Sequence, residues 1–287
     1  MIAQPQKSYT SRVALTVTEK EQNLRSLMRE MRSVLVAYSG GVDSAYLGLI
    51  ATQELGEKST CVMGLSPSVS EFQRAEAEKI ASGFNFNFET VDTAELDDPE
   101  YRANPTNRCY FCKSELFAKL TQIAEARTIQ FVIDGTNAED TADHRPGQIA
   151  ADEHNVRSPL VEAGLTKDEI RRLSNEQGLP SWDKPASPCL SSRIAYGVPV
   201  TIERLSKVEN GEQFLRDLGF REFRVRVHGD LVRIEISRDE LERALEIAMT
   251  GKLAVAFRGL GFKYVTLDLE GFRSGAMNES AKGSKGL

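Results

Sequence analysis

The most informative pattern of apolar and polar positions lies in the first fifth of the chain. Residues 34–38 form an apolar run of the kind that parallel sheets bury on both faces, and helical spacing of apolar positions follows at 45–55. A turn with two glycines, residues 39–41, separates them, so the pattern predicts a buried strand and a helix that begins near Asp43. Glycines let the backbone approach a ligand, and a helix N-terminus suits phosphate. An ordinary strand-to-helix turn is the competing interpretation.

Further apolar runs alternate with segments of helical spacing over the next part of the chain. The strand-like runs lie at 59–64, 84–91 and 131–134, and the helical segments lie at 18–31, 71–82, 112–126 and 166–178. Alternation at these lengths predicts an α/β fold, a doubly wound parallel sheet with right-handed crossovers. Two pairs have the spacing of capping boxes at helix N-termini, namely Thr18 with Glu21 and Thr166 with Glu169.

The pattern changes near residue 197 and predicts a smaller C-terminal α+β domain. Its expected elements are helices at 201–218 and 239–249 and strands at 222–228, 231–237 and 264–269. Polar stretches without clear periodicity lie at 97–106, 140–160 and 182–197, and long irregular stretches are often functional. We therefore expect a flexible arm at 1–17, an α/β domain with cysteine-bearing loops at 18–197, a substrate-binding or oligomerisation domain at 198–278, and a disordered tail at 279–287.

Composition narrows the function classes. The chain has 287 residues, 40% of them hydrophobic, and a formal net charge of −6, so it has no global basic field for nucleic acid. It has no run of 18 apolar residues that would span a membrane, and its polar start is unlike a signal peptide. We expect a cytoplasmic enzyme, in which four cysteines favour thiol chemistry or metal binding over a disulfide framework.

Three of the four cysteines lie in segments that could carry chemistry. Cys109 and Cys112 form a CxxC pair at a helix start, and Cys189 lies in the irregular stretch, whereas Cys61 falls in a predicted strand and is expected in the core. A structural zinc site normally needs four ligands, a thiol redox pair needs only the CxxC, and a [4Fe–4S] cluster held by three cysteines leaves one iron open. Unrelated thiols are the remaining interpretation.

The string from Ser39 to Ser44 resembles the pyrophosphate loop (PP-loop) of the N-type ATP pyrophosphatases, and it lacks the Gly-Lys-Ser/Thr of a Walker loop. Enzymes of that superfamily transfer AMP to a substrate oxygen and release pyrophosphate. The resemblance implies that loop N–H groups and serine hydroxyls hold the pyrophosphate and that Asp43 helps to hold Mg²⁺. The nucleotide-binding residues expected on this basis are Ser39, Gly40, Gly41, Val42, Asp43, Ser44, Gly64, Ser66, Lys113, Asp134, Gly135 and Thr136.

A narrower resemblance covers about residues 18–278. The stretches at 134–137, 184–193, 224–226 and 264–268 resemble the LarE family, which makes the nickel-pincer nucleotide cofactor. The resemblance implies an ATP-dependent sulfur transferase that adenylates the carboxylates of pyridinium-3,5-dicarboxylic acid mononucleotide and converts them to thiocarboxylates. Such a substrate carries anionic groups, and the side chains expected to bind it are Ser192, Arg193, Arg224 and Arg226.

The family supplies sulfur in two ways. One form sacrifices a cysteine three residues before the Ser-Ser pair, and the other has three cysteines and is thought to hold a [4Fe–4S] cluster that carries an extra sulfide. Here Pro188 occupies the sacrificial position and Cys189 follows it, so we expect a cluster on Cys109, Cys112 and Cys189 as the catalytic group. Sulfide or another sulfur donor would be a partner, and a homo-oligomer is expected.

Several rival functions share parts of this pattern. Sacrificial sulfur transfer from Cys189 is the nearest alternative. A tRNA thiolation enzyme needs a basic RNA surface, which this acidic chain lacks, and an amide-forming pyrophosphatase would use ammonia and no cysteines. A nonenzymatic AMP sensor or metal store leaves Arg224 and Arg226 unexplained.

Overall fold

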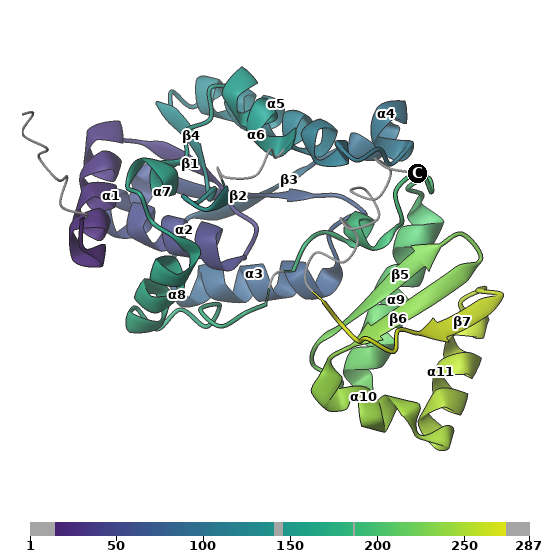
Figure 1. The fold of residues 1–287 in the computed structure, drawn as a ribbon. Coiled ribbons are helices and arrows are strands. Elements are labelled where there is room, and N and C mark those ends of the chain that lie inside the picture. The colour runs from purple at the N-terminus through teal and green to yellow at the C-terminus, as the bar shows by residue number, and fades with distance from the viewer. Residues whose placement is uncertain (1–14, 141–145, 186, 274–287) are drawn as a thin grey trace, which may run out of the picture.

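The computed structural model describes residues 15–140, 146–185 and 187–273. Its first part is built on a four-stranded parallel sheet in the order β3-β2-β1-β4 (Figure 1). The strands are β1 Val34–Ala37, β2 Ser59–Leu65, β3 Phe88–Asp92 and β4 Phe131–Asp134. The chain runs outward from β1 to β3 and then returns to the other side of β1 at β4. The strand order therefore reverses between β1 and β4, where ligands of such folds bind.

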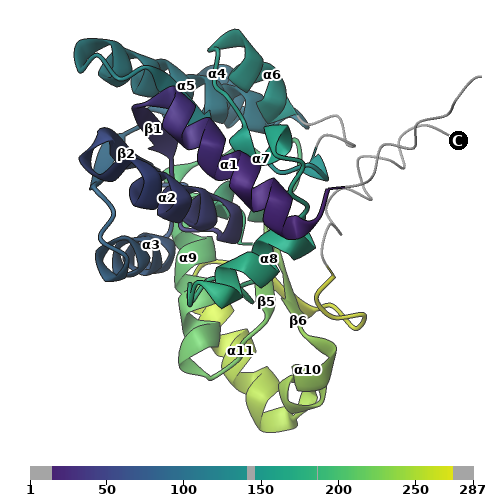
Figure 2. The same cartoon turned by 90° about the vertical axis from the view of Figure 1, so that its left-hand side faces the viewer.

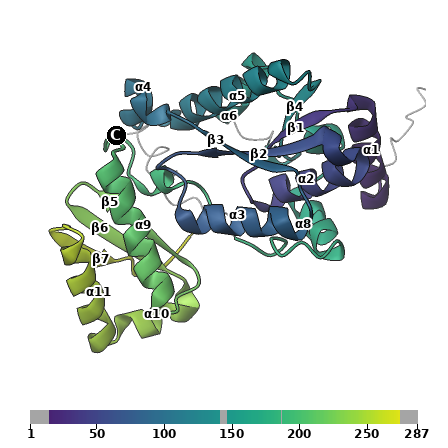
Figure 3. The ribbon, with the colours of Figure 1, turned by 180° about the vertical axis from the view of Figure 1, so that it is seen from behind.

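Helices cover both faces of this sheet (Figure 3). One face is covered by α1 Val17–Met31, α2 Val42–Leu55, α3 Glu71–Gly83 and α8 Lys167–Glu176, and the other by α5 Arg108–Ala126 and α6 Pro146–Glu153. Within β1, Val36 packs in the core under the first group of helices and Leu35 in the core under the second. Two cores on one sheet confirm the predicted doubly wound α/β fold.

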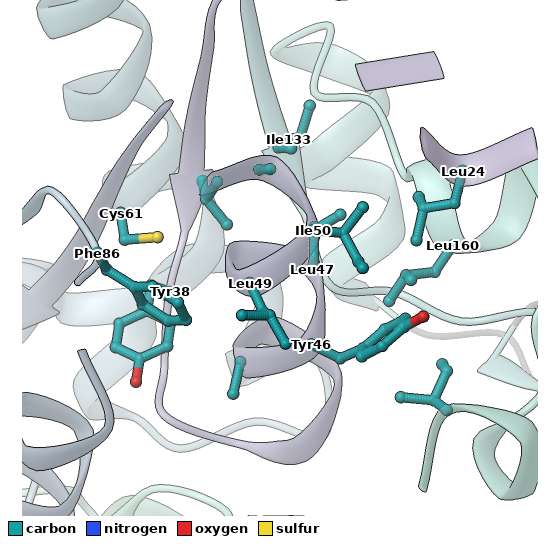
Figure 4. Packing of buried hydrophobic residues seen from close by; sticks show 14 of the residues in the cluster. Leu24, Tyr38, Tyr46, Leu47, Leu49, Ile50, Cys61, Phe86, Ile133 and Leu160 are labelled. Atoms are coloured by element: carbon teal, nitrogen blue, oxygen red, sulfur yellow. The ribbon is translucent and has the colours of Figure 1, made fainter. Parts of the chain in front are cut away.

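The helix α2 lies deepest in the first core. It is covered by the sheet, by α1 and by α8 (Figure 2), and Tyr46, Leu47 and Ile50 are fully buried. Figure 4 shows Ile50 facing the side of Leu24 and Leu160, with Tyr38 and Phe86 on the opposite side of the helix. Each fully buried aliphatic side chain stabilises the fold by about 1.5–3 kcal/mol. The glycine turn before α2 is therefore held on a rigid support.

The C-terminal part has its own sheet and core. A three-stranded sheet in the order β5-β6-β7 packs against helices on one face. Its elements are α9 Ile202–Asp217, β5 Phe223–His228, β6 Leu231–Ile236, α10 Arg238–Leu245, α11 Ile247–Gly259 and β7 Tyr264–Leu267. The strands β5 and β6 form the predicted hairpin, with Gly229 at a φ of +66° in the turn. A smaller α+β unit is therefore confirmed.

The core of this second unit extends beyond the boundary predicted at residue 197. Tyr101, Leu190 and Ile194 belong to it, although they precede that boundary in the sequence. Ile194 pairs in parallel with Val227 of β5, and Ala195 N donates to Val227 O at 3.0 Å. The segment before residue 197 thus packs as part of the second unit, which the change of pattern in the sequence did not reveal.

Some element boundaries differ from the prediction. The first helix is capped by Thr16, with Glu19 as its capping-box partner, so the prediction of Thr18 and Glu21 was wrong by two residues. Two pairs of the same spacing compete there, and the apolar period does not decide between them. The capping box of Thr166 and Glu169 is confirmed.

Three regions contain elements that the pattern did not predict. The stretch at 97–106 contains α4 Pro99–Arg102, and the stretch at 140–160 contains α6 and the start of α7 Pro159–Glu162. The helix predicted at 239–249 is two helices that meet at Glu246. The third strand begins at Phe88, four residues later than predicted, and α5 begins at Arg108, so the CxxC pair lies in its first turns.

Parts of the predicted organisation lie outside the described residues. These are positions 1–14 of the predicted arm, the tail at 279–287, and residues 141–145 of the polar stretch. Thr16 caps α1, so the helix starts within the predicted arm. In the part of the chain that the structure describes, no helix has the length and apolarity that a membrane crossing requires.

Two helical glycines provide a test of the packing. A Cβ on Gly211 of α9 would lie 2.6 Å from Phe257 Cε1, whereas a Cβ on Gly251 of α11 meets nothing within 4 Å. We expect Gly211→Ala to lower the free energy of unfolding by about 1–3 kcal/mol through overpacking. The matched Gly251→Ala variant should raise it by roughly 0.5–1 kcal/mol through helix propensity. Chemical denaturation measures both, and equal effects at the two sites would contradict this packing.

Candidate functional site

The turn before α2 is ordered by its own hydroxyl groups. Ser39 N donates to Ser44 Oγ at 3.1 Å, the Oγ atoms of Ser39 and Ser44 are 3.0 Å apart, and Ser44 Oγ donates to Gly41 O at 3.3 Å. Gly40 has a φ of +69°, and a Cβ there would lie 2.6 Å from the Cβ of Ala77 in α3. The position therefore needs glycine for both its backbone conformation and its contact with α3.

The turn after β4 lies against the same helix start. A Cβ on Gly135 would lie 2.9 Å from Ser44 N, so glycine is required for the two turns to touch. Asp134 is buried and accepts hydrogen bonds from Thr136 N at 3.1 Å, Thr136 Oγ1 at 2.7 Å and Ser158 Oγ at 2.7 Å. The structure thus brings the predicted turns of β1 and β4 together at the switch point of the sheet.

Asp43 is the acidic residue of this site. Its Oδ2 accepts from Lys167 Nζ at 2.5 Å, while its Oδ1 is buried and accepts no hydrogen bond of regular geometry from the described residues, although the Asn137 side chain lies near the carboxyl. Burial raises the pKa of the Asp43 carboxyl, and Lys167 opposes that rise. A buried oxygen that lacks a partner, close to a helix N-terminus, suits a divalent cation that is shared with phosphate.

The three cysteines share one neighbourhood. Burial raises the pKa of the Cys112 thiol well above its usual value, and Cys189, Glu95 and Cys109 raise it further, in that order. Desolvation, and after it Cys189, also raises the pKa of the Cys109 thiol, although Cys109 is the most exposed of the three residues. The Arg108 guanidinium acts on both thiols in the opposite direction. Arg108 Nη1 donates to Ser191 O at 2.9 Å, and Cys112 packs against the core that contains Leu190, so the CxxC pair and the segment with Cys189 lie in the same region.

The remaining cysteine is part of the core, as predicted. Cys61 is fully buried in β2, where burial raises the pKa of its thiol to about 12. Within residues 15–140, 146–185 and 187–273, no group of three or more histidines, cysteines or acidic residues is arranged to hold a single metal ion.

A buried clamp holds the Cys189 segment against the start of α5. The Asn104 side chain is inaccessible to solvent, and its Nδ2 donates to the carbonyls of Ala195 at 2.9 Å, Val198 at 2.9 Å and Ile194 at 3.3 Å. Arg108 Nη1 donates to Ser191 O at 2.9 Å and also to the Asn104 side chain. Sequence reasoning missed both residues, although Arg108 directly precedes the CxxC pair.

A ring of hydroxyl groups adds to this clamp. Tyr101 Oη lies 2.7 Å from Ser191 Oγ and 2.8 Å from Ser68 Oγ, and Ser191 Oγ donates to Ser68 Oγ at 2.9 Å. All three side chains are buried, so their hydroxyl groups satisfy one another rather than water. The loop after β2 is thereby joined to the residues that follow Cys189.

The glycine turn at 39–44, which is the predicted phosphate turn, and the segment at 187–192, called the cysteine segment from here on, both contact α3. Gln73 Nε2 donates to Ser187 O at 2.7 Å and Pro188 O at 3.4 Å, one helical turn from the Ala77 that touches Gly40. Residues four apart on a helix share a face, so the two segments are neighbours. A second link runs through Lys113, which follows Cys112 and donates to Asp134 Oδ2 at 3.2 Å.

The predicted substrate arginines occupy different environments. Arg193 is buried, forms an ion pair with Glu212 at 2.9 Å, and donates to the carbonyls of Pro188 and Cys189, the latter at 3.2 Å. Arg226 is buried against Glu235 at 3.0 Å and donates to Ser192 O at 3.2 Å. These two arginines therefore hold the cysteine segment in place.

Arg224 is the more accessible of the strand arginines. Its guanidinium lies 4.7 Å from the ring centre of Phe272, and Nη1 donates to Phe223 O at 2.7 Å. Burial, and after it the neighbouring Arg193, lowers the pKa of Arg224 to about 10. A desolvated cation that lies beside other cations is stabilised when an anion binds next to it.

Two predicted nucleotide residues have structural contacts of their own. A Cβ on Gly64 would lie 2.9 Å from Leu116 Cδ1, so this glycine also allows α5 to approach β2. Ser66 Oγ donates to Glu95 Oε1 at 2.5 Å. Ser66 also lines a cavity of about 400 Å³ beyond the ends of β2 and β3, with Arg74 and Asp92 on its wall.

Comparisons with known proteins agree with this class of site. No family model matches the chain. A putative glutamine-hydrolysing GMP synthase of Halalkalibacterium halodurans is 26% identical over 65% of this chain and 40% of its own length. The parallel sheet, its glycine turn and this relative define an enzyme of the ATP pyrophosphatase class, the PP-loop superfamily.

Two further relatives cover almost the whole chain. An uncharacterised protein of Synechocystis, slr1717, is 44% identical over 90% of this chain and 97% of its own length. Pyridinium-3,5-bisthiocarboxylic acid mononucleotide synthase of Lactiplantibacillus plantarum is 34% identical over 92% of this chain and 96% of its own length. The chain belongs to the LarE family, as the motifs predicted.

Asp43→Asn tests the burial of charge at this site. The pKa of Asp43 is raised in the folded state, so its proton stabilises the fold at low pH, and that stabilisation is lost as pH rises through the folded pKa. In the absence of ATP and Mg²⁺, we expect the variant to melt roughly 2–4 °C higher than the parent at pH 7, the shift for about 1 kcal/mol. The difference should disappear near pH 4.

Asp230→Asn is the matched control. The exposed carboxyl of Asp230 has a lowered pKa because of Lys263, so its stabilisation is present at pH 7 and is lost as pH falls. We therefore expect no rise in melting temperature for this variant. A lower melting temperature for Asp43→Asn at pH 7 would contradict the buried-charge interpretation.

Proposed function

We propose that this chain is an ATP-dependent, AMP-forming sulfur transferase that acts on the carboxylates of pyridinium-3,5-dicarboxylic acid mononucleotide. The observation that carries the proposal is the contact of α3 with both the Ser39–Ser44 turn and the cysteine segment, through Ala77 and Gln73. An activating site and a sulfur site are then neighbours. The product named for the L. plantarum relative is the bisthiocarboxylic acid that this chemistry yields.

The first step is activation of the carboxylate. A carboxylate oxygen attacks the α-phosphate of ATP, and pyrophosphate leaves. The N–H groups at the start of α2 and the hydroxyls of Ser39 and Ser44 bind the pyrophosphate as negative charge gathers on it. The free Oδ1 of Asp43 would hold Mg²⁺, which neutralises charge on phosphate oxygens. Lys113 lies between Cys112 and Asp134, where it can bind a phosphate.

The second step is sulfur transfer. An anionic sulfur attacks the acyl carbon, and AMP leaves with one of the two carboxylate oxygens. The raised pKa values of Cys109 and Cys112 mean that free thiols at these positions are poor nucleophiles near neutral pH. A metal centre bound by these cysteines would remove this difficulty, because it would keep its sulfur ligands deprotonated.

The ligand count favours a cluster on Cys109, Cys112 and Cys189 with one iron open to sulfide. Three cysteines are the number of protein ligands that such a cluster would need. The described residues do not place three metal-binding side chains around one ion, so the ligand count alone carries this assignment. Such a cluster would supply sulfide as the nucleophile. The protein side chains keep the thiols together, exclude water and leave the acyl group within reach.

The domain organisation fits a substrate site on the second sheet. Arg224 of β5 is proposed to bind an anionic group of the mononucleotide. Ser192, whose carbonyl accepts from Arg226 on the same strand, is proposed to contribute its hydroxyl to that site. Arg193 and Arg226 contribute through the backbone carbonyls that they hold. Residues 198–278 together with the segment before them would then form the substrate-binding unit.

The activation step is tested by Asp43→Asn in a pyrophosphate-release assay with the mononucleotide substrate. We expect release to fall by at least about 100-fold, because metal clamping of phosphate contributes several kcal/mol. Asp168→Asn, which changes an exposed carboxylate in the first turn of α8 beside Lys167, is the control and should keep parental activity. Near-parental release from folded Asp43→Asn would refute the ATP assignment.

The sulfur source is tested by single-turnover assays of anaerobically prepared cysteine variants. We expect Cys109→Ala, Cys112→Ala and Cys189→Ala each to lose thiocarboxylate formation by at least about 100-fold, because a three-cysteine centre fails when any ligand is missing. Cys61→Ala, in the core of β2, is the control. Full product from Cys109→Ala and Cys112→Ala, with none from Cys189→Ala, would instead support sacrifice of Cys189. Product with ammonia or binding of tRNA would support the remaining rivals.

A further inference from the structure

Arg108 carries a buried positive charge at the start of α5. Only 4% of the residue is exposed, and its Nη1 donates to Ser191 O and to the Asn104 side chain, both of which are neutral acceptors. Among the described residues, no Asp or Glu forms an ion pair with this guanidinium. Burial of a charge is costly unless an opposite charge lies nearby. An anion is therefore expected beside Arg108.

The buried Glu95 is one candidate for that anion, and the cysteines are the others, because they lie in the two segments that Arg108 joins. Arg108 directly precedes Cys109 in the first turn of α5, and Cys112 follows one helical turn later. The carbonyl that it holds belongs to Ser191, two residues after Cys189. The Arg108 guanidinium thus joins the helix start that carries Cys109 and Cys112 to the segment that carries Cys189.

We propose that Arg108 is the positioning residue of the three-cysteine centre. It holds Cys189 beside the CxxC pair through the Ser191 carbonyl, and it supplies the positive charge that compensates the thiolates and sulfide gathered there. The inference rests on the proposed function, because it assigns a role to Arg108 in that same centre. Arginine suits the task because its planar fork binds two acceptors at once while its charge is permanent.

The arrangement has a consequence for the apoprotein. When the Ser191 carbonyl is held, the Cys189 thiol has a high effective concentration at the CxxC pair. Mild oxidation with diamide should then join Cys189 to Cys109 or Cys112, in competition with the disulfide between Cys109 and Cys112. The latter two lie on one helix turn, so their own disulfide does not depend on Arg108 and serves as the internal standard.

The experiment compares these two disulfides by peptide mass spectrometry in the parent, Arg108→Gln and Arg108→Lys. We expect the share of disulfides that contain Cys189 to fall about tenfold or more in Arg108→Gln and at least about threefold in Arg108→Lys, because a flexible ammonium holds the carbonyl less firmly. Arg204→Gln is the matched control, since Arg204 donates to the exposed Pro199 carbonyl at 2.8 Å and should leave the ratio unchanged.

A second readout tests the charge. After anaerobic reconstitution with iron and sulfide, Arg108→Lys should keep more than half of the parental iron and sulfide per chain, whereas Arg108→Gln should keep less than about a tenth. Equal retention in the two variants would overturn the role of the charge. If the parent binds no iron, the cluster proposal fails, while the disulfide ratio still decides the positioning role.

Two results would contradict the positioning role of Arg108. It is overturned if the parent forms no disulfide with Cys189, or if the disulfide ratio of Arg108→Gln equals that of the parent. If Arg108→Gln melts more than about 10 °C below the parent, its disulfide ratio reflects a damaged fold. The disulfide ratio of Arg108→Lys then tests the positioning role by itself. A parental ratio in that variant then overturns the inference, and a threefold fall supports it.

Discussion

The buried hydrogen bonds of Asn104 and Arg108 are the constraint on which the candidate site depends. Asn104 satisfies three carbonyls of the segment after Cys189, and Arg108 holds a fourth. Ser191 O and Ala195 O also accept from the backbone N–H groups of Ile194 and Val198. The carbonyls of Ile194 and Val198 accept side-chain hydrogen bonds from Asn104, and leaving such a carbonyl buried and unpaired costs about 1–3 kcal/mol. The same bonds join the two structural units, because the segment they hold pairs with β5 and packs in the second core. The cysteine segment is therefore fixed by both units at once.

The phosphate site depends on a different feature, the close contact between turns that contain glycine. Gly40 lies against Ala77 of α3, and Gly135 lies against the start of α2 at Ser44. These contacts fix the backbone conformation of the turn. Its N–H groups at the carboxyl edge of the sheet therefore have a set orientation. Because Gln73 on the same face of α3 holds the cysteine segment, one helix sets the spacing between the glycine turn and that segment, which are the proposed sites of ATP and of sulfur. Neighbouring sites reduce the chance that an activated acyl group meets water before sulfur.

Much of the first unit could be predicted from the sequence, because its strands are short apolar runs and its phosphate turn has a distinctive string. The boundary near residue 197 could not, since Tyr101, Leu190 and Ile194 join the second core through tertiary packing that no local period reports. Arg193 and Arg226 were predicted to bind substrate from the family resemblance and from their charge, neither of which reveals the carbonyls that they hold. The clamp residues Asn104 and Arg108 were missed because their partners lie about 80–95 positions away.

The central claim is that sulfur leaves from a renewable three-cysteine centre and not from the side chain of Cys189. The most direct measurement is intact mass of the protein after anaerobic turnover with ATP, Mg²⁺, the mononucleotide and excess sulfide, together with the amount of thiocarboxylate formed per chain. The account predicts an unchanged protein mass and more than one sulfur transferred per chain. A loss equal to one H₂S per chain, in step with a single transfer, would mark dehydroalanine at position 189 and contradict the account.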